Sequence, residues 1–158
     1  MVKKDWVKLI VSLVLCQMAG FIGAIFSSSG VKTWFITLNK PYFNPPSWVF
    51  APVWTVLYIL MGISFFIIWK RSHSRSKVPA ITFFIIQLIL NSLWSFLFFG
   101  LNNIQFAFIE IIILWIFIIV CVITFYPISK TASIMLIPYL LWVSFALVLN
   151  YEIMRLNI

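Results

Sequence analysis

Hydrophobic residues along the chain form five long runs, separated by polar or proline-containing stretches. A helix needs about 20 apolar residues to cross the hydrocarbon core of a bilayer, and each run reaches that length. Backbone polar groups in lipid must be satisfied within their own segment, so we expect helices. The pattern predicts an all-α integral membrane bundle of five transmembrane helices that forms one domain over residues 1–158. The expected helices cover about residues 6–26, 48–69, 79–99, 104–125 and 131–153.

The connection between the first two runs, residues 27–46, is the longest in the chain. A loop of that length in a compact protein is commonly functional or disordered. It contains Trp34, Phe35, Tyr42 and Phe43, whose rings gain free energy by burial or by lying at the membrane interface. We therefore expect a long structured loop that covers the bundle, with a short helical turn near Trp34.

Composition and charge agree with a membrane protein. Hydrophobic residues make up 64% of the chain and charged residues 9%, which excludes an ordinary soluble domain. If the helices alternate in direction, one side carries most of the positive charge, which places the amino terminus in the cytoplasm of a multi-pass protein of the cell membrane. This arrangement and anionic lipid explain the net charge of +8 without nucleic acid. The basic side holds Lys3, Lys4, Lys8, Lys70, Arg71, Arg75, Lys77 and Lys130, and the other side holds Lys32, Lys40 and Arg155.

The amino-terminal run resembles a secretory signal peptide in its basic start and apolar middle. Its apolar part continues to Phe26, which is too long for the core of a cleaved signal, so we expect a retained helix. Ala19, Gly20, Gly23 and Ala24 form a doubled small-xxx-small pattern in this helix. Such a pattern indicates close helix packing, either within one subunit or across a dimer.

Polar and aromatic residues within the other helices recur at helical spacing, so each set shares one face. Two interpretations stay open: ordinary packing between helices, or the wall of a ligand pocket in which flat rings alternate with small residues. The sets are Ala51, Trp54, Tyr58 and Phe65 in the second helix, Gln87, Asn91 and Trp94 in the third, and Tyr139, Trp142, Ala146 and Asn150 in the fifth.

Glu110 is the one carboxylate placed deep in a predicted helix. No basic residue is expected at its depth, so we expect Glu110 to be uncharged or to lie close to the membrane surface nearest Asn102 and Asn103. Pro138 falls near the middle of the fifth predicted helix, where the missing N–H should bend the axis close to Trp142.

Conventional catalytic constellations are missing from the sequence. Its acidic residues are Asp5, Glu110 and Glu152, which leaves no carboxylate pair for acid and base chemistry. The single histidine, His73, is expected in a solvated loop and cannot supply two axial ligands to a haem. Cys16 and Cys121 lie in predicted helices and have no metal-binding spacing. We therefore predict no metal site and no required cofactor, so any catalysis would come from the ligand or from tryptophans.

Three ordered motifs resemble the family of tryptophan-rich sensory proteins and translocator proteins, also called peripheral-type benzodiazepine receptors. They read KPYFNPPSWVFAPVWTVLYILMG, QLILNSLWSFLFFG and PYLLWVSFALVLNYEIMR, and the resemblance runs from about Gly20 to Arg155. It implies five transmembrane helices, a homodimer and a pocket beneath the first loop. It also implies binding of porphyrins such as protoporphyrin IX and of the synthetic ligand PK11195.

The resemblance implies pocket positions that largely repeat the helical sets above. With Tyr58 from the second-helix set, the predicted ligand-binding residues are Trp34, Ala51, Trp54, Tyr58, Asn91, Trp94, Trp142, Ala146 and Leu149. Mitochondrial relatives bind cholesterol, but the sterol segment is matched here only at Leu149, Tyr151 and Arg155, so we expect no sterol role.

Bacterial members of the family are linked to tetrapyrrole regulation and stress responses. The leading hypothesis is therefore a membrane receptor or sensor for porphyrins. An alternative is light-dependent porphyrin degradation, with Trp54 and Trp142 as the candidate catalytic residues. A porphyrin or lipid carrier is a further alternative, which the missing internal repeat disfavours.

Overall fold

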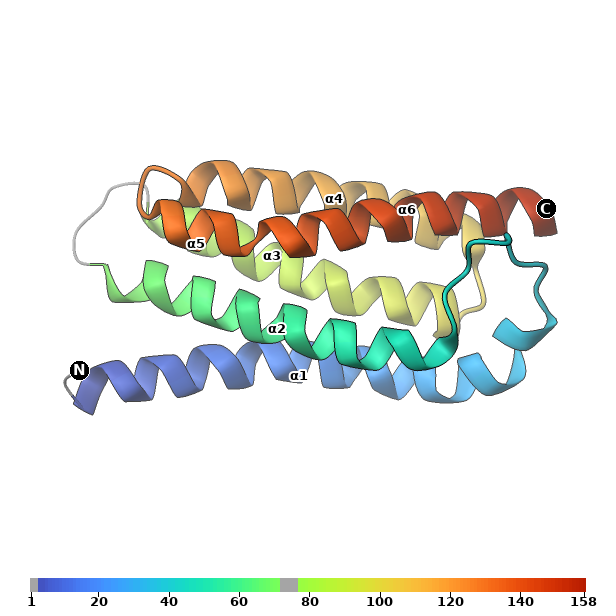
Figure 1. The fold of residues 1–158 in the computed structure, drawn as a ribbon, viewed down its shortest axis with the longest axis horizontal. Coiled ribbons are helices and arrows are strands. Elements are labelled where there is room, and N and C mark those ends of the chain that lie inside the picture. The colour runs from blue at the N-terminus through green and yellow to red at the C-terminus, as the bar shows by residue number, and fades with distance from the viewer. Residues whose placement is uncertain (1–2, 72–76) are drawn as a thin grey trace.

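The computed structural model describes residues 3–71 and 77–158, and over these ranges the chain is a helical bundle without strands (Figure 1). His73 and Arg75, which the sequence places in a connecting loop, lie outside the described residues. The α-helices are α1 (Lys3–Thr33), α2 (Ser47–Lys70), α3 (Lys77–Ser95), α4 (Ile104–Phe125), α5 (Lys130–Met135) and α6 (Ile137–Asn157). Two short turns complete the set, the 3-10 turn η1 (Phe35–Thr37) and the π-helical turn η2 (Phe96–Gly100).

Five helical spans within the described residues are long and apolar enough to cross a membrane. The turn η2 continues α3, and α5 and α6 together make the last span. The spans are Lys4–Thr33, Ser47–Lys70, Lys77–Gly100, Ile104–Phe125 and Lys130–Asn157. The predicted all-α bundle of five transmembrane helices is confirmed.

The end of α1 differs most from the prediction, because the helix continues past Phe26 to Thr33. Serine side chains satisfy backbone carbonyls within this extension: Ser27 Oγ donates to Gly23 O at 2.8 Å and Ser28 Oγ to Ile25 O at 2.9 Å. Gly30 lies so close to Phe99 that a Cβ atom on Gly30 would be 2.9 Å from the Cβ atom of Phe99. With 31 residues, α1 is about 46 Å long, which exceeds the hydrocarbon thickness.

The other helices begin and end closer to the positions that the sequence predicts. The fourth helix begins and ends where the sequence predicts, and the Asn103 side chain accepts the Phe106 N–H at 2.9 Å as its N-terminal cap. The last span is interrupted at Leu136, whose N–H donates to Ser133 O at 3.1 Å. Pro138 follows in the first turn of α6, where its missing N–H is tolerated. The sequence predicted a bend near the middle of this helix; the structure instead has an interruption at Leu136, in the first third of the span.

Both ends of the bundle have a distinct charge character. The start of α1, the end of α2 and the starts of α3 and α5 lie together at one end (Figure 1). Lys70 Nζ and Asp5 Oδ2 form an ion pair of 2.8 Å there. The opposite end carries the carboxyl terminus, the long loop, Lys32 and Lys40. The described basic residues are therefore divided between the ends as the alternating helices predict.

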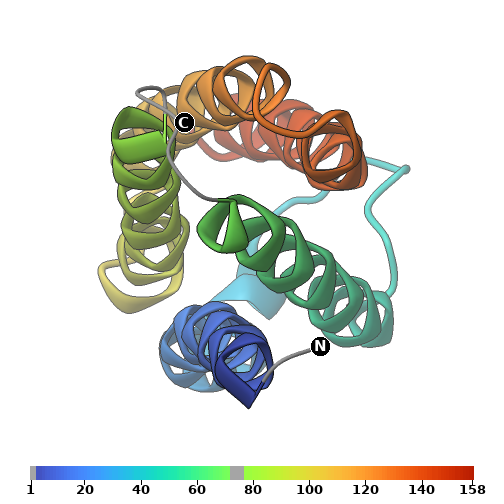
Figure 2. The same ribbon diagram turned by 90° about the vertical axis from the view of Figure 1, so that its left-hand side faces the viewer.

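Packing is tight in the half of the bundle nearest the basic end. Phe84 stacks on Phe65 with ring centroids 4.7 Å apart, and on Phe125 at 5.8 Å. Gly62 lets α1 approach α2, since a Cβ on Gly62 would lie 2.9 Å from Leu13 Cδ2. Figure 2, which looks along the bundle, shows α1 and α2 on one side and α3, α4 and α6 around the other.

The loop of residues 34–46 is structured and crosses the end of α6 (Figure 1). The Asn39 N–H donates to Asn157 Oδ1 at 2.9 Å, and Asn157 Nδ2 donates to Asn39 O at the same distance. The rings of Phe43 and Phe145 meet edge to face at 6.3 Å. The predicted helical turn near Trp34 is present as η1. The loop is therefore fastened to the carboxyl-terminal helix.

Candidate functional site

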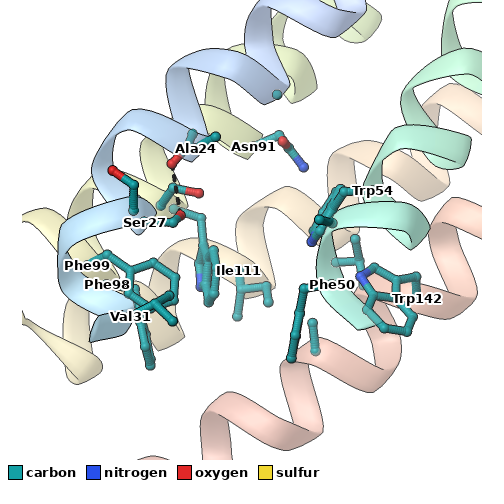
Figure 3. A pocket seen from close by; sticks show the side chains of 18 of the residues that line it. Ala24, Ser27, Val31, Phe50, Trp54, Asn91, Phe98, Phe99, Ile111 and Trp142 are labelled. Carbon is teal, nitrogen blue, oxygen red and sulfur yellow. Dashed lines mark hydrogen bonds between the residues drawn. The ribbon is translucent and has the colours of Figure 1, made fainter. Parts of the chain in front are cut away.

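A cavity of about 630 Å³ lies inside the half of the bundle nearest the loop. Every membrane span contributes to its wall, and η1 adds Phe35. This volume lies within the range of small-molecule sites, about 300–1,000 Å³. Figure 3 shows Phe50, Trp54 and Trp142 on one side, with α1 and the rings of Phe98 and Phe99 on the other.

Paired aromatic rings make up much of the wall contributed by α2 and α6. Trp54 stacks on Tyr58 with centroids 5.5 Å apart and an interplanar angle of 27°. Phe50 meets Trp142 edge to face at 6.0 Å. Because each ring is held by another ring, the indole faces have fixed directions before any ligand enters. Such a wall suits a flat, apolar partner.

A chain of hydrogen bonds supports the deep end of the cavity. Tyr58 donates its hydroxyl hydrogen to Asn91 Oδ1, which joins α2 to α3. Asn91 Nδ2 donates to the Tyr139 hydroxyl at 3.0 Å, and that hydroxyl donates to Gln87 Oε1 at 3.0 Å. Tyr58 and Asn91 line the cavity, whereas Tyr139 and Gln87 lie behind them. The Asn91 amide is therefore held in one orientation by two helices.

The three cavity tryptophans differ in how their indole N–H groups are used. Trp94 Nε1 donates to Asn150 Oδ1 at 3.0 Å, and Asn150 Nδ2 donates to Ile104 O at 3.3 Å. Among the described residues no partner accepts a hydrogen bond from Trp54 or Trp142. Two indole donors at the cavity are therefore free to meet a ligand.

The structure brings eight of the nine predicted binding residues together around this cavity. They are Ala51, Trp54, Tyr58, Asn91, Trp94, Trp142, Ala146 and Leu149. Trp34 is the exception, because it is absent from the lining and packs edge to face against Phe98 at 5.3 Å. Its neighbour Phe35 lines the cavity instead. The longer α1 sets this arrangement, since Trp34 follows directly on the helix end.

Among the lining residues that the prediction missed, α1 contributes the largest group. Ala24, Ser27 and Val31 face the aromatic wall in Figure 3. The small-residue pattern did mark this stretch, and Gly20 and Gly23 both line the cavity. A Cβ on Gly20 would lie 2.4 Å from Tyr58 Cε2, so only glycine lets the tyrosine ring occupy its position. The pattern therefore has a ring-packing role beyond contact between helices.

Glu110 lies in the second turn of α4 and is 5% exposed. Neither carboxyl oxygen has a hydrogen-bond partner among the described residues. Its neighbour Ile111 lines the cavity, but Glu110 does not. Glu110 is therefore buried within the bundle, about two turns from Asn103, and its uncharged state stays a prediction.

The described residues offer few groups for metal binding or for thiol chemistry. They contain no group of three side chains that could hold a metal ion. Cys16 and Cys121 are both buried as free thiols. The cavity thus offers ring faces, two free indole donors and one fixed amide, which suit binding of a flat amphipathic molecule.

Comparison with known proteins shows similarity over almost the whole chain. A sequence profile of the TspO/MBR family matches residues 12–156. "Tryptophan-rich protein TspO" of Archaeoglobus fulgidus is 43% identical over 150 residues, which cover 95% of this chain and 97% of the relative. The protein of the same name from Chlorobaculum tepidum is 40% identical over 155 residues, 98% of each chain. "Translocator protein" of Bos taurus is 32% identical over 154 residues, 96% of this chain and 91% of the relative.

Proposed function

Because the chain belongs to the TspO/MBR family, we propose that it is a membrane receptor or sensor for porphyrins of the protoporphyrin IX class and for PK11195-like ligands. The observation that carries the proposal is the cavity of about 630 Å³ between the indole rings of Trp54, Trp94 and Trp142. These rings are fixed in place by other rings or by hydrogen bonds. We also propose a sensory role in tetrapyrrole regulation or stress response, which the family resemblance implies.

A porphyrin suits the cavity because its macrocycle is flat, apolar on both faces and polar at its edge. The ring faces would lie against Trp54 and Trp142, whose free N–H groups can meet polar atoms. Asn91 would contact the edge at the deep end, held there by Tyr58 and Tyr139. A preformed wall lowers the entropy cost of binding.

Trp54→Ala and Trp142→Ala test this proposal. Each removes one ring face from the wall, and one aromatic contact is worth about 0.5–1.5 kcal/mol beyond its buried area. We expect each variant to weaken protoporphyrin IX binding by at least about two- to twelvefold. Trp48→Ala is the matched control, since Trp48 lies on the same helix, is 75% exposed and does not line the cavity.

The affinity is measured by titrating porphyrin into protein-containing nanodiscs and following the porphyrin absorption band, with empty nanodiscs as the blank. This readout does not depend on tryptophan fluorescence, which each substitution changes. If Trp54→Ala and Trp142→Ala bind porphyrin as well as Trp48→Ala does, the cavity is not the binding site.

A second candidate function is light-dependent degradation of the bound porphyrin. The indole rings of Trp54 and Trp142 favour it, because they line the cavity and an indole in contact with a photoexcited ligand can donate an electron to it, with dissolved oxygen as the final oxidant. Trp54→Phe and Trp142→Phe should keep the apolar wall and lose product formation under illumination. Chromatography of the products, with Trp48→Phe and free porphyrin as controls, decides the matter. Products identical to those of free porphyrin argue against an enzyme.

We also propose that the protein is a homodimer of the cell membrane with its basic end in the cytoplasm. The ends of α1, α2, α3 and α5 that carry most of the lysines support this orientation. Single cysteines introduced at Lys4 and Arg155, labelled with an impermeant maleimide in intact cells, test it. Labelling at Lys4 instead of Arg155 would reverse the orientation.

A further inference from the structure

We propose that Lys32 is the site that holds an anionic edge group of the ligand, so that the cavity selects flat apolar molecules with a carboxylate at one edge. This inference rests on the proposed function of the cavity and adds the chemistry that orients the ligand in it. Three independent features carry it: the charges of the lining, the use of its other donors, and the direction in which the cavity opens.

Charge is the first feature. Among the described residues that line the cavity, Lys32 alone has an ionised side chain. It lies in the last turn of α1, is exposed, and forms no ion pair or hydrogen bond through its side chain with the described residues. An ammonium group offers three donors, so Lys32 can receive a carboxylate without breaking an existing contact.

Several other polar side chains of the lining already donate hydrogen bonds within the protein, and the donors that remain free, such as the Trp54 and Trp142 N–H groups, are uncharged. Asn91 and Tyr58 bind each other and Tyr139. Thr55 Oγ1 donates to Ala51 O at 2.8 Å, and Ser27 and Ser28 donate to backbone carbonyls of α1. A carboxylate placed at the deep end would therefore lose its hydration without gaining a cation. Within the described lining, an anionic group gains an ion pair only toward the Lys32 end.

The direction in which the cavity opens also favours a ligand whose anionic group lies at Lys32. Gln17 and Phe21 line the cavity and also line a shallow groove on the outer surface of α1, so the cavity reaches the membrane-facing side of this helix. At the other extreme the lining includes Lys32 and Ser47, the first residue of α2. Gly20 and Lys32 are about 18 Å apart along the helix axis.

An amphiphile in the outer part of a bilayer already has this arrangement. Its apolar body lies at the depth of the hydrocarbon and its charged edge lies at the surface. Entry sideways past α1 would keep that orientation and deliver the charged edge to Lys32, with the apolar body against Trp54 and Trp142. The cavity would thus bind the ligand in the orientation that the ligand already has in the bilayer.

The test compares an acid with its ester in two variants. Protoporphyrin IX and its dimethyl ester are titrated into the wild-type protein, Lys32→Gln and Arg155→Gln in nanodiscs of neutral lipid. Arg155 is the matched control, because it is an exposed cation at the same end of the bundle and does not line the cavity. Pyrenebutyric acid and its methyl ester form a second pair of flat probes that is independent of porphyrin chemistry.

We expect Lys32→Gln to weaken the acids about two- to fivefold, in line with a partly exposed ion pair, and to leave the esters unchanged. Lys32→Arg should restore most of the acid affinity, and Arg155→Gln should change neither ligand. Equal losses for acid and ester, equal losses in both variants, or no loss in Lys32→Gln would each overturn the inference.

The same titrations separate this inference from the proposed function. If the wild-type protein binds neither porphyrin but binds pyrenebutyrate in a Lys32-dependent way, the receptor proposal fails and the anion site stands. If porphyrin binds and depends on Trp142 but not on Lys32, the receptor proposal stands and the anion site is wrong. Wild-type protein that binds no acid of either pair overturns both.

Discussion

Replacing Tyr139 by phenylalanine tests whether the hydrogen-bond chain behind the cavity stabilises the bundle. Tyr139 is 1% exposed, and its hydroxyl accepts from Asn91 Nδ2 and donates to Gln87 Oε1, both at 3.0 Å. Phenylalanine keeps the ring that meets Trp54 edge to face at 6.2 Å. The substitution therefore removes two hydrogen bonds and almost no apolar contact.

The size of the effect follows from those two bonds. A hydrogen bond between membrane helices contributes about 0.6 kcal/mol on average and up to about 1.7. Gln87 Nε2 already lacks a partner among the described residues, so loss of the Tyr139 bond leaves the whole Gln87 amide buried without one. We expect Tyr139→Phe to lower the free energy of unfolding by about 1–2 kcal/mol.

Unfolding in mixed micelles with increasing dodecyl sulfate, followed by circular dichroism, measures this difference. Tyr126→Phe is the matched control, since Tyr126 is 53% exposed at the end of α4 and should change stability by less than about 0.5 kcal/mol. Equal stabilities of Tyr139→Phe and Tyr126→Phe would refute the reasoning. The double variant Gln87→Leu with Tyr139→Phe should cost less than the sum of the single changes, because the buried Gln87 amide is then absent and Asn91 Nδ2 alone loses its partner.

Two further predictions concern the cavity and its cover. Gly20→Ala places a Cβ 2.4 Å from the Tyr58 ring, so we expect the free energy of unfolding to fall by about 1–3 kcal/mol and porphyrin to bind more weakly in the same titrations. Gly100→Ala is the control and should change porphyrin binding little. Unchanged porphyrin binding by Gly20→Ala would show that the Tyr58 ring can move freely. Asn157→Ala removes both bonds to the Asn39 backbone, so the loop should open more often and porphyrin should dissociate several-fold faster in stopped-flow chase experiments; an unchanged dissociation rate would mean that the loop does not control release.

The helices of this protein are predictable where an apolar run has a clear chemical boundary. The fourth run ends at Asn103 on one side, where an asparagine caps the helix, and before Pro127 on the other. The first run lacks such a signal, because serines and a glycine follow Phe26 and are typical of a loop. Helix continues there because Ser27 and Ser28 bond to carbonyls and Gly30 packs against Phe99, a contact that sequence spacing does not reveal.

The candidate site was predictable to the extent that helical spacing sets its faces. Asn91 and Trp94 share one face of α3, and Trp142 and Ala146 share one face of α6, so each pair reaches the cavity together. Trp34 was misplaced because its position depends on the tertiary contact with Phe98. The hydrogen bonds that hold the loop to α6 join Asn39 and Asn157, which are 118 positions apart in sequence. Helical periodicity cannot predict a contact over such a separation.

The aromatic stretch that begins α2 shows why counting rings does not locate a site. Tyr42 is 100% exposed and Trp48 is 75% exposed, so these rings are on the outer surface, where amphipathic rings suit a membrane interface. Trp54 lies six residues after Trp48, and Tyr58 follows one turn later; both face the cavity. Because six residues correspond to a rotation of about 240° around a helix, the two tryptophans cannot share a face. The helix phase therefore places one tryptophan on the outer surface and the other at the cavity, although the two residues are chemically identical.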